Sequence, residues 1–257
     1  MEGRLIPFIG AGVSLPLGLP DWGRLVDFIA QQLDFDPDVF RLNGTDQQLA
    51  GYYVAQKGKI GPLRSELDRL FNPSDAAILD SKVHRALVDL GFPVIYTTNY
   101  DRIIERAFKL HNKPCRAISS LEDIDSSPIN GETQIVKFHG TFDDDESLVL
   151  TESSYFERFD FESPIDIKLR ADMLGRSLLF VGYSLTDVNI RYMLYKMHRL
   201  RAATQRDFRR KSNAYLVTFG RNEVQAKLLE GWDIQVVELG HSPDKEECVA
   251  KFLEALS

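Results

Sequence analysis

The chain has 257 residues and a formal net charge of −7, and its composition is 44% hydrophobic and 27% charged. This length suits one large domain or one domain with an inserted subdomain, and the composition is that of a soluble globular protein. The acidic balance disfavours a nucleic-acid binder as the default, because contacts to phosphate need lysine and arginine.

The chain opens with an apolar run that stops at three small residues. Residues 5–9 are apolar and lead directly into Gly10, Ala11 and Gly12. This pattern predicts a buried strand followed by a glycine turn. A helix is expected from residue 22 to about residue 33, because apolar side chains recur on one helical face of that segment.

The rest of the chain first shows helical patterns and then an alternation of strands and helices. We expect helices over 47–54 and 63–71, and a third that starts at a Ser74 cap and is broken near Ser81. Strands are predicted at 93–97, 134–138, 178–182, 214–218 and 234–237. Helices are predicted at 101–110, 151–174, 187–200, 222–230 and 243–256.

This alternation is typical of a parallel sheet whose two faces are both covered by helices. The predicted fold class is therefore α/β, with a Rossmann-like doubly wound parallel sheet. We expect a single domain over 1–257, in which the helical stretches at about 24–90 and 142–175 are insertions.

Four motifs fall at predicted strand ends. They are Gly10-Ala11-Gly12-Val13-Ser14, Thr97-Thr98-Asn99-Tyr100-Asp101, Phe138-His139-Gly140 and Gly182-Tyr183-Ser184. In a doubly wound sheet, ligands bind beyond the carboxyl ends of the strands. The convergence of the four motifs on this edge predicts a ligand site there more strongly than any one of them.

Each motif also has an interpretation that involves no ligand. Gly10 and Gly12 let the backbone approach a phosphate closely, but a turn needed only for packing explains them equally well. His139 is either a general base near neutral pH or a strand-end histidine bonded to a carbonyl. Asn99 and Asp101 form an amide and carboxylate pair at the edge, or one of them caps the next helix. From the residues alone, these alternatives stay open.

The four motifs, together with Gly18-Leu19-Pro20-Asp21-Trp22, resemble the sirtuin signature. The first motif and this segment are similar to the family's GAG(I/V)S and GIPDF patterns, with Trp22 in place of the usual phenylalanine. The other three are similar to its TQNID, catalytic LHG and GTS patterns. All occur in the family's order, from residue 10 to residue 184. The resemblance covers most of the chain and implies NAD+ as substrate, and the cysteine pattern described below predicts no metal.

The resemblance also implies a role for each matching residue. Asn99 is expected to hold a water or the ribose near C1′ of NAD+, Asp101 to orient the ribose or nicotinamide end, and His139 to act as the base. The implied NAD+ contacts are Gly10, Ala11, Gly12 and Ser14 at the pyrophosphate, Asp21 and Trp22 at the nicotinamide, Gly182 and Ser184 at the adenosine, and also Thr98. Phe219 and Gly220 are expected to bound the adenine.

One part of the family's pattern is missing. Sirtuin deacylases carry four zinc-binding cysteines between the catalytic histidine and the GTS-like loop, whereas no cysteine lies between His139 and Gly182. Cys115 and Cys248 form no CxxC pair, which predicts reduced thiols and excludes the usual structural zinc site. This departure resembles bacterial sirtuin-like defence proteins, which hydrolyse NAD+ to ADP-ribose and nicotinamide. The predicted function is therefore an NAD+ hydrolase (NADase) of antiphage defence.

Three other interpretations stay open. The first is protein deacylation or ADP-ribosylation in the same NAD+ pocket, although the missing zinc module argues against deacylation. A non-catalytic subunit that senses NAD+ or ADP-ribose, or scaffolds a defence complex, is the second. A basic cluster over residues 199–211 offers a nucleic-acid contact, but such a run is more commonly a solvated linker.

The resemblance implies partners as well. A toxic NAD+ hydrolase must be restrained, so we expect a homo-oligomer or control by a partner protein, such as a HerA-type ATPase or a short Argonaute protein. No apolar stretch reaches the roughly 18 residues needed to span a membrane, and no signal peptide is recognised. A cytoplasmic protein is expected.

Overall fold

The computed structural model describes residues 4–19, 22–125, 131–185, 187–204, 214–220 and 222–256. Within them the chain forms a seven-stranded sheet in which all neighbouring strands are parallel. The strands are β1 (Leu5–Ile9), β2 (Val94–Thr97), β3 (Cys115–Ile118), β4 (Thr133–Lys137), β5 (Ser177–Val181), β6 (Ala214–Thr218) and β7 (Ile234–Glu238). The predicted α/β class with a doubly wound parallel sheet is confirmed.

The strand order reverses beside β1. The sheet order is β3-β4-β2-β1-β5-β6-β7, so the chain first builds outward on the β2 side and then returns to add β5, β6 and β7 on the other. Ile9 is level with Thr97 of β2 and with Val181 of β5, so the three central strands end together. A crevice opens at such a reversal, beyond the carboxyl ends of the strands.

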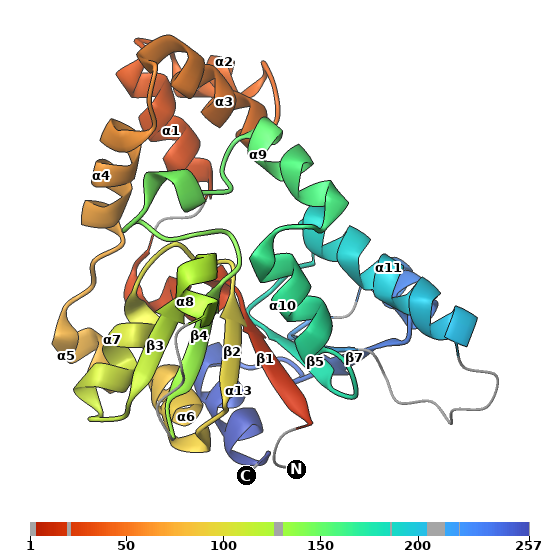
Figure 1. Cartoon of the computed structure of the whole chain (residues 1–257). Helices are drawn as coiled ribbons and strands as arrows, with labels where there is room; N and C mark the ends of the chain where they lie inside the picture. Colours follow the sequence, from red (N-terminus) through yellow and green to blue (C-terminus); the bar gives the residue numbers. More distant parts are fainter. Residues whose placement is uncertain are drawn as a thin grey trace.

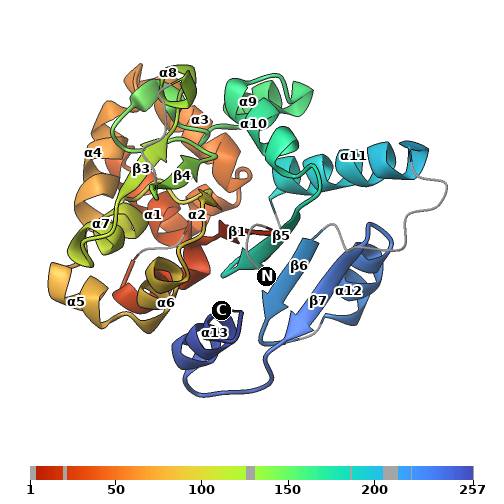
Figure 2. The same ribbon diagram turned by 60° about the horizontal axis from the view of Figure 1, so that its bottom comes forward.

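Alternate strand positions fill two apolar layers, one on each face of the sheet. Helices lie against both faces (Figures 1 and 2). Ile6 and Phe8 belong to one layer, and Ile9 belongs to the other. The first layer is covered by α8 (Leu121–Asp125), α10 (Pro164–Asp172), α11 (Val188–Thr204) and α12 (Glu223–Glu230). The second is covered by α5 (Asp75–Asp80), α6 (Lys82–Leu90), α7 (Ile103–Leu110) and α13 (Lys245–Glu254).

A separate group of helices stands above the carboxyl edge of the sheet (Figure 1). It comprises α1 (Trp22–Gln32), α2 (Pro37–Arg41), α3 (Asp46–Lys57) and α4 (Gly61–Leu70), with α9 (Glu152–Glu157) packed beside α3. These helices share a hydrophobic cluster that includes Ile29, Tyr53 and Phe142. A capping box of Thr45 and Gln48 sets the start of α3. The division of residues 1–257 into one domain with two insertions stays a prediction.

Sequence patterns located the long elements and missed short ones. The break at Ser81 is confirmed, because Ser81 separates α5 from α6. Strand β3 was not predicted, since it lies at the sheet edge and is only half buried, so its residues show no apolar run. Helix α2 was also missed, because its five residues start at an Asp36 cap that reads as a turn. In the described part of the chain, no helix has both the length and the apolar character to cross a membrane.

Candidate active site

A cavity of about 1370 Å³ lies between the carboxyl edge of the sheet and the helices above it. Drug-sized ligands occupy pockets of roughly 300–1,000 Å³, so this cavity has room for a larger molecule. The predicted site residues that line it are Ala11, Gly12, Ser14, Trp22, Thr98, Asn99, Asp101, His139, Gly182 and Ser184. Gly10 is not part of the lining, Phe219 and Gly220 are, and Asp21 lies outside the described residues.

The glycine turns after β1 and β5 are locked against each other. A Cβ atom on Gly10 would lie 2.5 Å from the Gly182 carbonyl oxygen, and one on Gly12 would lie 2.8 Å from the same atom. Gly182 itself has φ of +65°, and its carbonyl accepts a hydrogen bond from the Gly12 N–H at 2.9 Å. The packing interpretation therefore explains Gly10, Gly12 and Gly182 without a ligand.

Most backbone amides of the first glycine turn are already hydrogen-bonded. The N–H groups of Gly10, Gly12, Val13 and Ser14 donate to backbone carbonyls at 2.9–3.2 Å. The Ala11 N–H has no such acceptor among the described residues, and Ala11 lines the cavity. The turn thus leaves the Ala11 amide as its backbone donor for an anionic ligand.

Asn99 lies in the turn after β2, beside the first glycine turn. Thr97 Oγ1 accepts from the Asn99 backbone N–H at 3.0 Å and donates to the Ile9 carbonyl at 2.9 Å. The Asn99 side-chain nitrogen lies 3.5 Å from Ser14 Oγ, and the residue is 8% exposed. Asn99 is thereby tied to both β1 and β2. It does not cap α7, which begins at Ile103.

The N-cap residue of α7 is Arg102, so neither Asn99 nor Asp101 occupies that position, although the Asp101 carboxylate does bind the start of the helix. Asp101 Oδ1 accepts from the Ile103 N–H at 3.0 Å, at the first residue of α7. Burial raises the pKa of Asp101, and the nearby Lys137 ammonium opposes that shift. Asp101 also lines the cavity, and the bond to Ile103 accounts for Oδ1 alone.

His139 follows β4 and is 2% exposed. Its Nε2 lies 3.3 Å from Asp187 Oδ2 but outside hydrogen-bond geometry, so the atom is buried without a hydrogen-bond partner among the described residues. Burial lowers the pKa of His139, and the Asp187 carboxylate partly opposes this. The imidazole is therefore neutral near pH 7. An unpaired buried nitrogen beside a cavity favours a general base over a histidine bonded to a carbonyl.

Asp187 is a site residue that sequence reasoning missed. Its Oδ1 accepts from the N–H groups of Asn189 and Ile190 at 2.9 and 3.2 Å, where α11 begins, while Oδ2 faces His139. Leu185, in the same loop, is fully buried with φ of +54°, a conformation that leucine rarely adopts. A carboxylate at the first residue of a predicted helix was the available signal, but a capping role already explains such a residue, so the sequence gives no indication of what its second oxygen contacts.

Two tyrosines complete the surroundings of His139, and neither was predicted. Burial raises the pKa of the Tyr183 hydroxyl, and this hydroxyl also interacts with Thr98 and Asp187, so polar contacts link the ends of β2 and β5. The Tyr155 ring of α9 meets the His139 ring edge-on, with centroids 5.3 Å apart, and Tyr155 is hydrogen-bonded to Gln47 of α3. The helices above the sheet therefore reach the carboxyl edge of the sheet through Tyr155.

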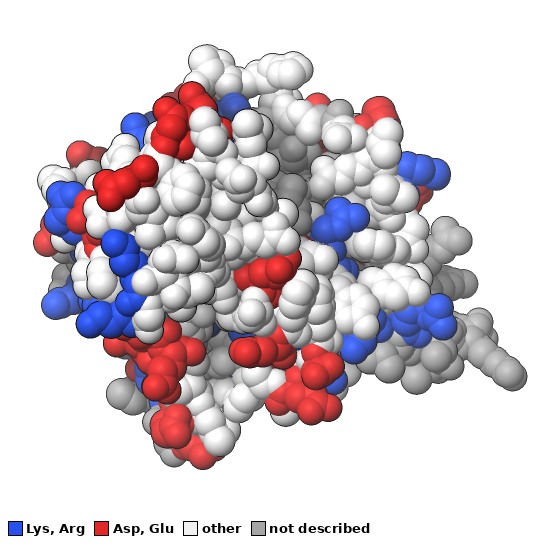
Figure 3. Space-filling view, turned by 90° about the horizontal axis from the view of Figure 1, so that it is seen from above, with Lys and Arg blue, Asp and Glu red and all other residues white. Residues whose placement is uncertain are grey.

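The charged side chains around the cavity are mostly acidic. Among the described residues they are Asp46, Asp101, Glu152, Asp187, Glu246 and a single cation, Lys245. Seen from above, uncharged residues cover much of the face, interrupted by separate acidic and basic groups (Figure 3). The part of the chain that the structure describes contains no group of three His, Cys, Asp or Glu placed to hold a metal. The cavity thus offers a more favourable environment to cationic than to anionic groups.

Comparison with known proteins places the chain in a family. Residues 93–237, more than half of the chain, match the SIR2-like domain family. The chain belongs to the SIR2-like domain family. This SIR2-like chain is 31% identical over 215 residues to NAD(+) hydrolase ThsA of Bacillus cereus (strain MSX-D12), a match that covers 82% of the chain and 42% of that protein.

A second relative of this SIR2-like chain is also a longer protein. Defense-associated sirtuin 2 of Bacillus subtilis is 27% identical over 209 residues, which cover 77% of the chain and 20% of that protein. The chain thus spans less than half the length of these curated relatives. A solved structure described as that of a Sir2 homolog–NAD complex has a TM-score of 0.50 and 14% identity, and the match covers 98% of this chain and 90% of the other. At this identity the likeness establishes the shared fold.

Proposed function

We propose that this SIR2-like domain hydrolyses NAD+ to ADP-ribose and nicotinamide in the cavity at the carboxyl edge. One observation carries the proposal: Asn99 and buried His139, whose Nε2 has no hydrogen-bond partner among the described residues, line one cavity at the reversal of the strand order. Doubly wound sheets bind dinucleotides at this reversal. The similarity to NAD(+) hydrolase ThsA, at 31% identity over 82% of the chain, supports the same reaction.

In this reaction water replaces nicotinamide at C1′ of the ribose. The bond between C1′ and the nicotinamide nitrogen breaks, and its electron pair stays on nicotinamide, which leaves as a neutral molecule. A bond forms between C1′ and the water oxygen, and one proton is released. Because the transition state resembles an oxocarbenium ion, the site must position water and stabilise positive charge. A strong general acid is not required.

His139 is the residue we assign to accept the released proton. Burial lowers its pKa, so the imidazole is neutral near pH 7 and able to act as a base. Asp187 Oδ2, 3.3 Å from Nε2, stabilises the imidazolium that forms. Asn99, tied to β1 and β2, positions the water or the ribose. The acidic lining favours the cationic nicotinamide ring and the developing charge at C1′.

The remaining contacts are assigned to the ends of β1, β5 and β6. We assign the pyrophosphate to the Ala11 amide and the Ser14 hydroxyl, because the other amides of that turn donate to carbonyls. Gly12 and Gly182 shape the floor, with Gly10 packed behind it. Ser184, Phe219 and Gly220 border the adenosine end, and Trp22, Thr98 and Asp101 border the ribose and nicotinamide end. Asp21 keeps its predicted nicotinamide role, outside the described residues.

The test is nicotinamide release from NAD+ by the purified chain and by two variants. We expect His139→Ala to fold and to lose about 10²–10⁴-fold in turnover, the contribution of a positioned base. Asn99→Ala is expected to fold and to lose about 100-fold or more, because the water or the ribose is no longer positioned. His198→Ala is the matched control, because His198 pairs with Asp233 at the surface and does not line the cavity. Unchanged release in both folded site variants would exclude this site, and a wild-type chain that binds ADP-ribose without releasing nicotinamide would exclude hydrolysis by this chain alone.

We further propose that the activity serves defence by depleting NAD+, as the names of the relatives suggest. The homo-oligomer, the cytoplasmic location and a HerA-type ATPase or short Argonaute partner stay predictions of the resemblance. The basic cluster at 199–211 lies mostly outside the residues whose side chains are described, so a nucleic-acid contact there also stays a prediction.

A further inference from the structure

Lys137, at the end of β4, is a buried cation that the proposed reaction does not use. It is 1% exposed and among the largest fully buried side chains of the chain. Lysine is almost never fully buried without a partner, because its ammonium loses the hydration that water supplies. Lys137 lies two residues before His139, so the groups that bind its ammonium can affect the geometry of the candidate active site.

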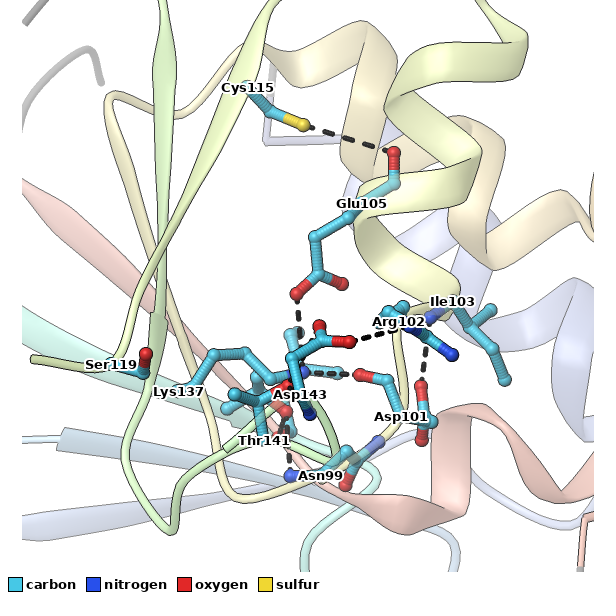
Figure 4. A network of polar contacts seen from close by, with 12 residues as sticks. Asn99, Asp101, Arg102, Ile103, Glu105, Cys115, Ser119, Lys137, Thr141 and Asp143 are labelled. Carbon is cyan, nitrogen blue, oxygen red and sulfur yellow. Dashed lines mark hydrogen bonds and ion pairs between the residues drawn. The ribbon is translucent and has the colours of Figure 1, made fainter. Parts of the chain in front are cut away.

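The ammonium of Lys137 reaches two groups of the segment that follows β2 (Figure 4). Nζ donates a hydrogen bond to the backbone carbonyl of Asp101, and it lies 3.3 Å from Glu105 Oε1 on α7. The second Glu105 oxygen, Oε2, is buried without a hydrogen-bond partner in the described part of the chain. Glu105 therefore balances the charge of Lys137. Because one Glu105 oxygen is buried without a hydrogen bond, the Lys137–Glu105 pair by itself contributes little to the stability of the fold.

The Asp101 carbonyl belongs to the turn that carries Asn99. Within this turn, the N–H groups of Asn99 and Ile103 are held by Thr97 Oγ1 and Asp101 Oδ1, which are both local contacts. The bond from Lys137 is different, because it joins residues 36 positions apart and comes from the strand that ends at His139. Lys137 thus connects the turn of Asn99 to the strand that presents His139.

We propose that Lys137 is a positioning residue. Its ammonium holds the Asn99–Asp101 turn in place relative to His139, and Glu105 neutralises the charge that this requires. The kinetic consequence rests on the proposed NAD+ hydrolysis. The structural consequence, a fixed turn, is measurable without any turnover.

The decisive variant replaces both charges at once. Lys137→Met with Glu105→Met keeps a similar side-chain volume and removes both charges of this ion pair together, so neither partner is left buried with an unpaired charge and the fold is expected to persist. The turn loses its donor, and we expect kcat for nicotinamide release to fall about 100-fold, the effect of a misplaced catalytic group, with little change in KM. The control variant is Lys168→Met with Asp172→Asn, which removes a partly buried ion pair on α10. The new asparagine can still accept the hydrogen bond that the Tyr96 hydroxyl donates to Asp172 in the wild type. This control variant is expected to keep the wild-type kcat.

A second pair separates positioning from packing. Lys137→Gln with Glu105→Gln has similar volume but keeps an N–H donor for the Asp101 carbonyl, so it is expected to recover at least part of the lost kcat. Hydrogen exchange at the amides of Asn99 and Ile103 is expected to accelerate in the Met pair and to stay slower in the Gln pair.

Equal kcat and equal exchange in wild type, Met pair and Gln pair would overturn the proposal. A wild-type chain without NAD+ hydrolysis would overturn the proposed function instead, and the exchange rates would still decide whether Lys137 holds the turn. If the Met pair does not fold, the Gln pair compared with wild type carries the test, and a Gln pair with rapidly exchanging Asn99 and Ile103 amides would contradict the expected rescue.

Discussion

The two halves of the cavity floor differ in the atoms that form them: backbone atoms form one half and side chains form the other. On the β1–β5 side the floor is main chain: the Gly12 N–H bonds to the Gly182 carbonyl, and neither residue has room for a Cβ atom. On the β2–β4 side the floor presents side chains, those of Asn99 and His139, from two loops that need holding. The first half depends on the absence of Cβ atoms at the two glycines. The second half depends on neighbouring groups that hold the Asn99 and His139 side chains in place.

Each loop of the β2–β4 side is held by a cation that donates to a backbone carbonyl, one fully buried and the other partly buried. Lys137 donates to Asp101, and Arg158 donates to Phe138 at 2.7 Å. Arg158 is also bonded through Nε to Asp166 Oδ2 at 3.0 Å, and its guanidinium lies 4.4 Å from the centre of the Phe138 ring. Mutations in the backbone half should therefore disrupt the site by steric crowding, whereas mutations in the side-chain half should disrupt it by loss of side-chain orientation.

The largest effect is expected when one partner of the buried pair behind His139 is removed. Arg158→Met leaves Asp166, which is 1% exposed, without its counter-charge, and an unpaired buried charge costs about 3–5 kcal/mol of unfolding free energy. Urea unfolding at pH 7 measures the loss. Adding Asp166→Leu to the same variant is expected to restore most of the stability. A single variant as stable as wild type would mean that the pair does not support the His139 loop.

A single added methyl group, in Gly12→Ala, is expected to disrupt the packing of the backbone half. Gly12→Ala places a Cβ atom 2.8 Å from the Gly182 carbonyl oxygen, and such overpacking costs roughly 1–3 kcal/mol. ADP-ribose binding, measured by calorimetry, is expected to weaken as the two turns separate. Gly51→Ala is the control, because its nearest neighbour, Thr151, is 3.9 Å away and alanine favours a helix by up to about 1 kcal/mol. Wild-type affinity in Gly12→Ala would show that the interlock is not part of the ligand site.

These expectations also show which features sequence patterns could supply. The strand ends were predictable, because apolar runs such as 178–182 stop at residues that continue no strand. The glycine turns were predictable as turns, but their mutual contact depends on β1 and β5 being neighbours, which only the strand order decides. A sequence pattern therefore identified Gly12 and Gly182 without distinguishing ligand binding from packing.

The supporting side chains were beyond sequence reasoning for a physical reason. In the sequence, Lys137 looks like an ordinary polar residue near the end of a strand, and its burial depends on a carbonyl 36 residues away. Asp187 looks like a helix cap, and it is one, but its second oxygen faces His139 only because β4 and β5 end at the same edge. Local patterns report local structure, and these contacts are made between elements distant in sequence.

A finer test of the side-chain half is its dependence on pH. The pKa of His139 is lowered by burial, and the base must be neutral, so activity is expected to be flat near pH 7 and to fall only below pH 6.5. Below the pKa, the loss approaches about tenfold per pH unit. Because Asp187 raises this pKa, Asp187→Asn is expected to move the acid limb of kcat/KM to still lower pH. An acid limb of kcat/KM that lies above pH 7 in the wild type, or that moves to higher pH in Asp187→Asn, would argue against His139 as the base.

The smallest effect is expected for an exposed ion pair close to the same turn. Arg102 is 44% exposed and lies 2.6 Å from both Asp68 and Asp143. Solvent-exposed pairs contribute about 0–1 kcal/mol, so Arg102→Gln should change the unfolding free energy little and leave kcat intact. A loss as large as that of Arg158→Met would remove the distinction between buried and exposed cations around the site.

The most direct test of the central claim measures ADP-ribose binding and nicotinamide release together in Asn99→Ala and Gly12→Ala. The account predicts that Asn99→Ala binds ADP-ribose like wild type but releases almost no nicotinamide, while Gly12→Ala loses binding and release together. Wild-type turnover in Asn99→Ala, or loss of ADP-ribose binding in both variants alike, would contradict the division of the cavity into a binding half and a catalytic half.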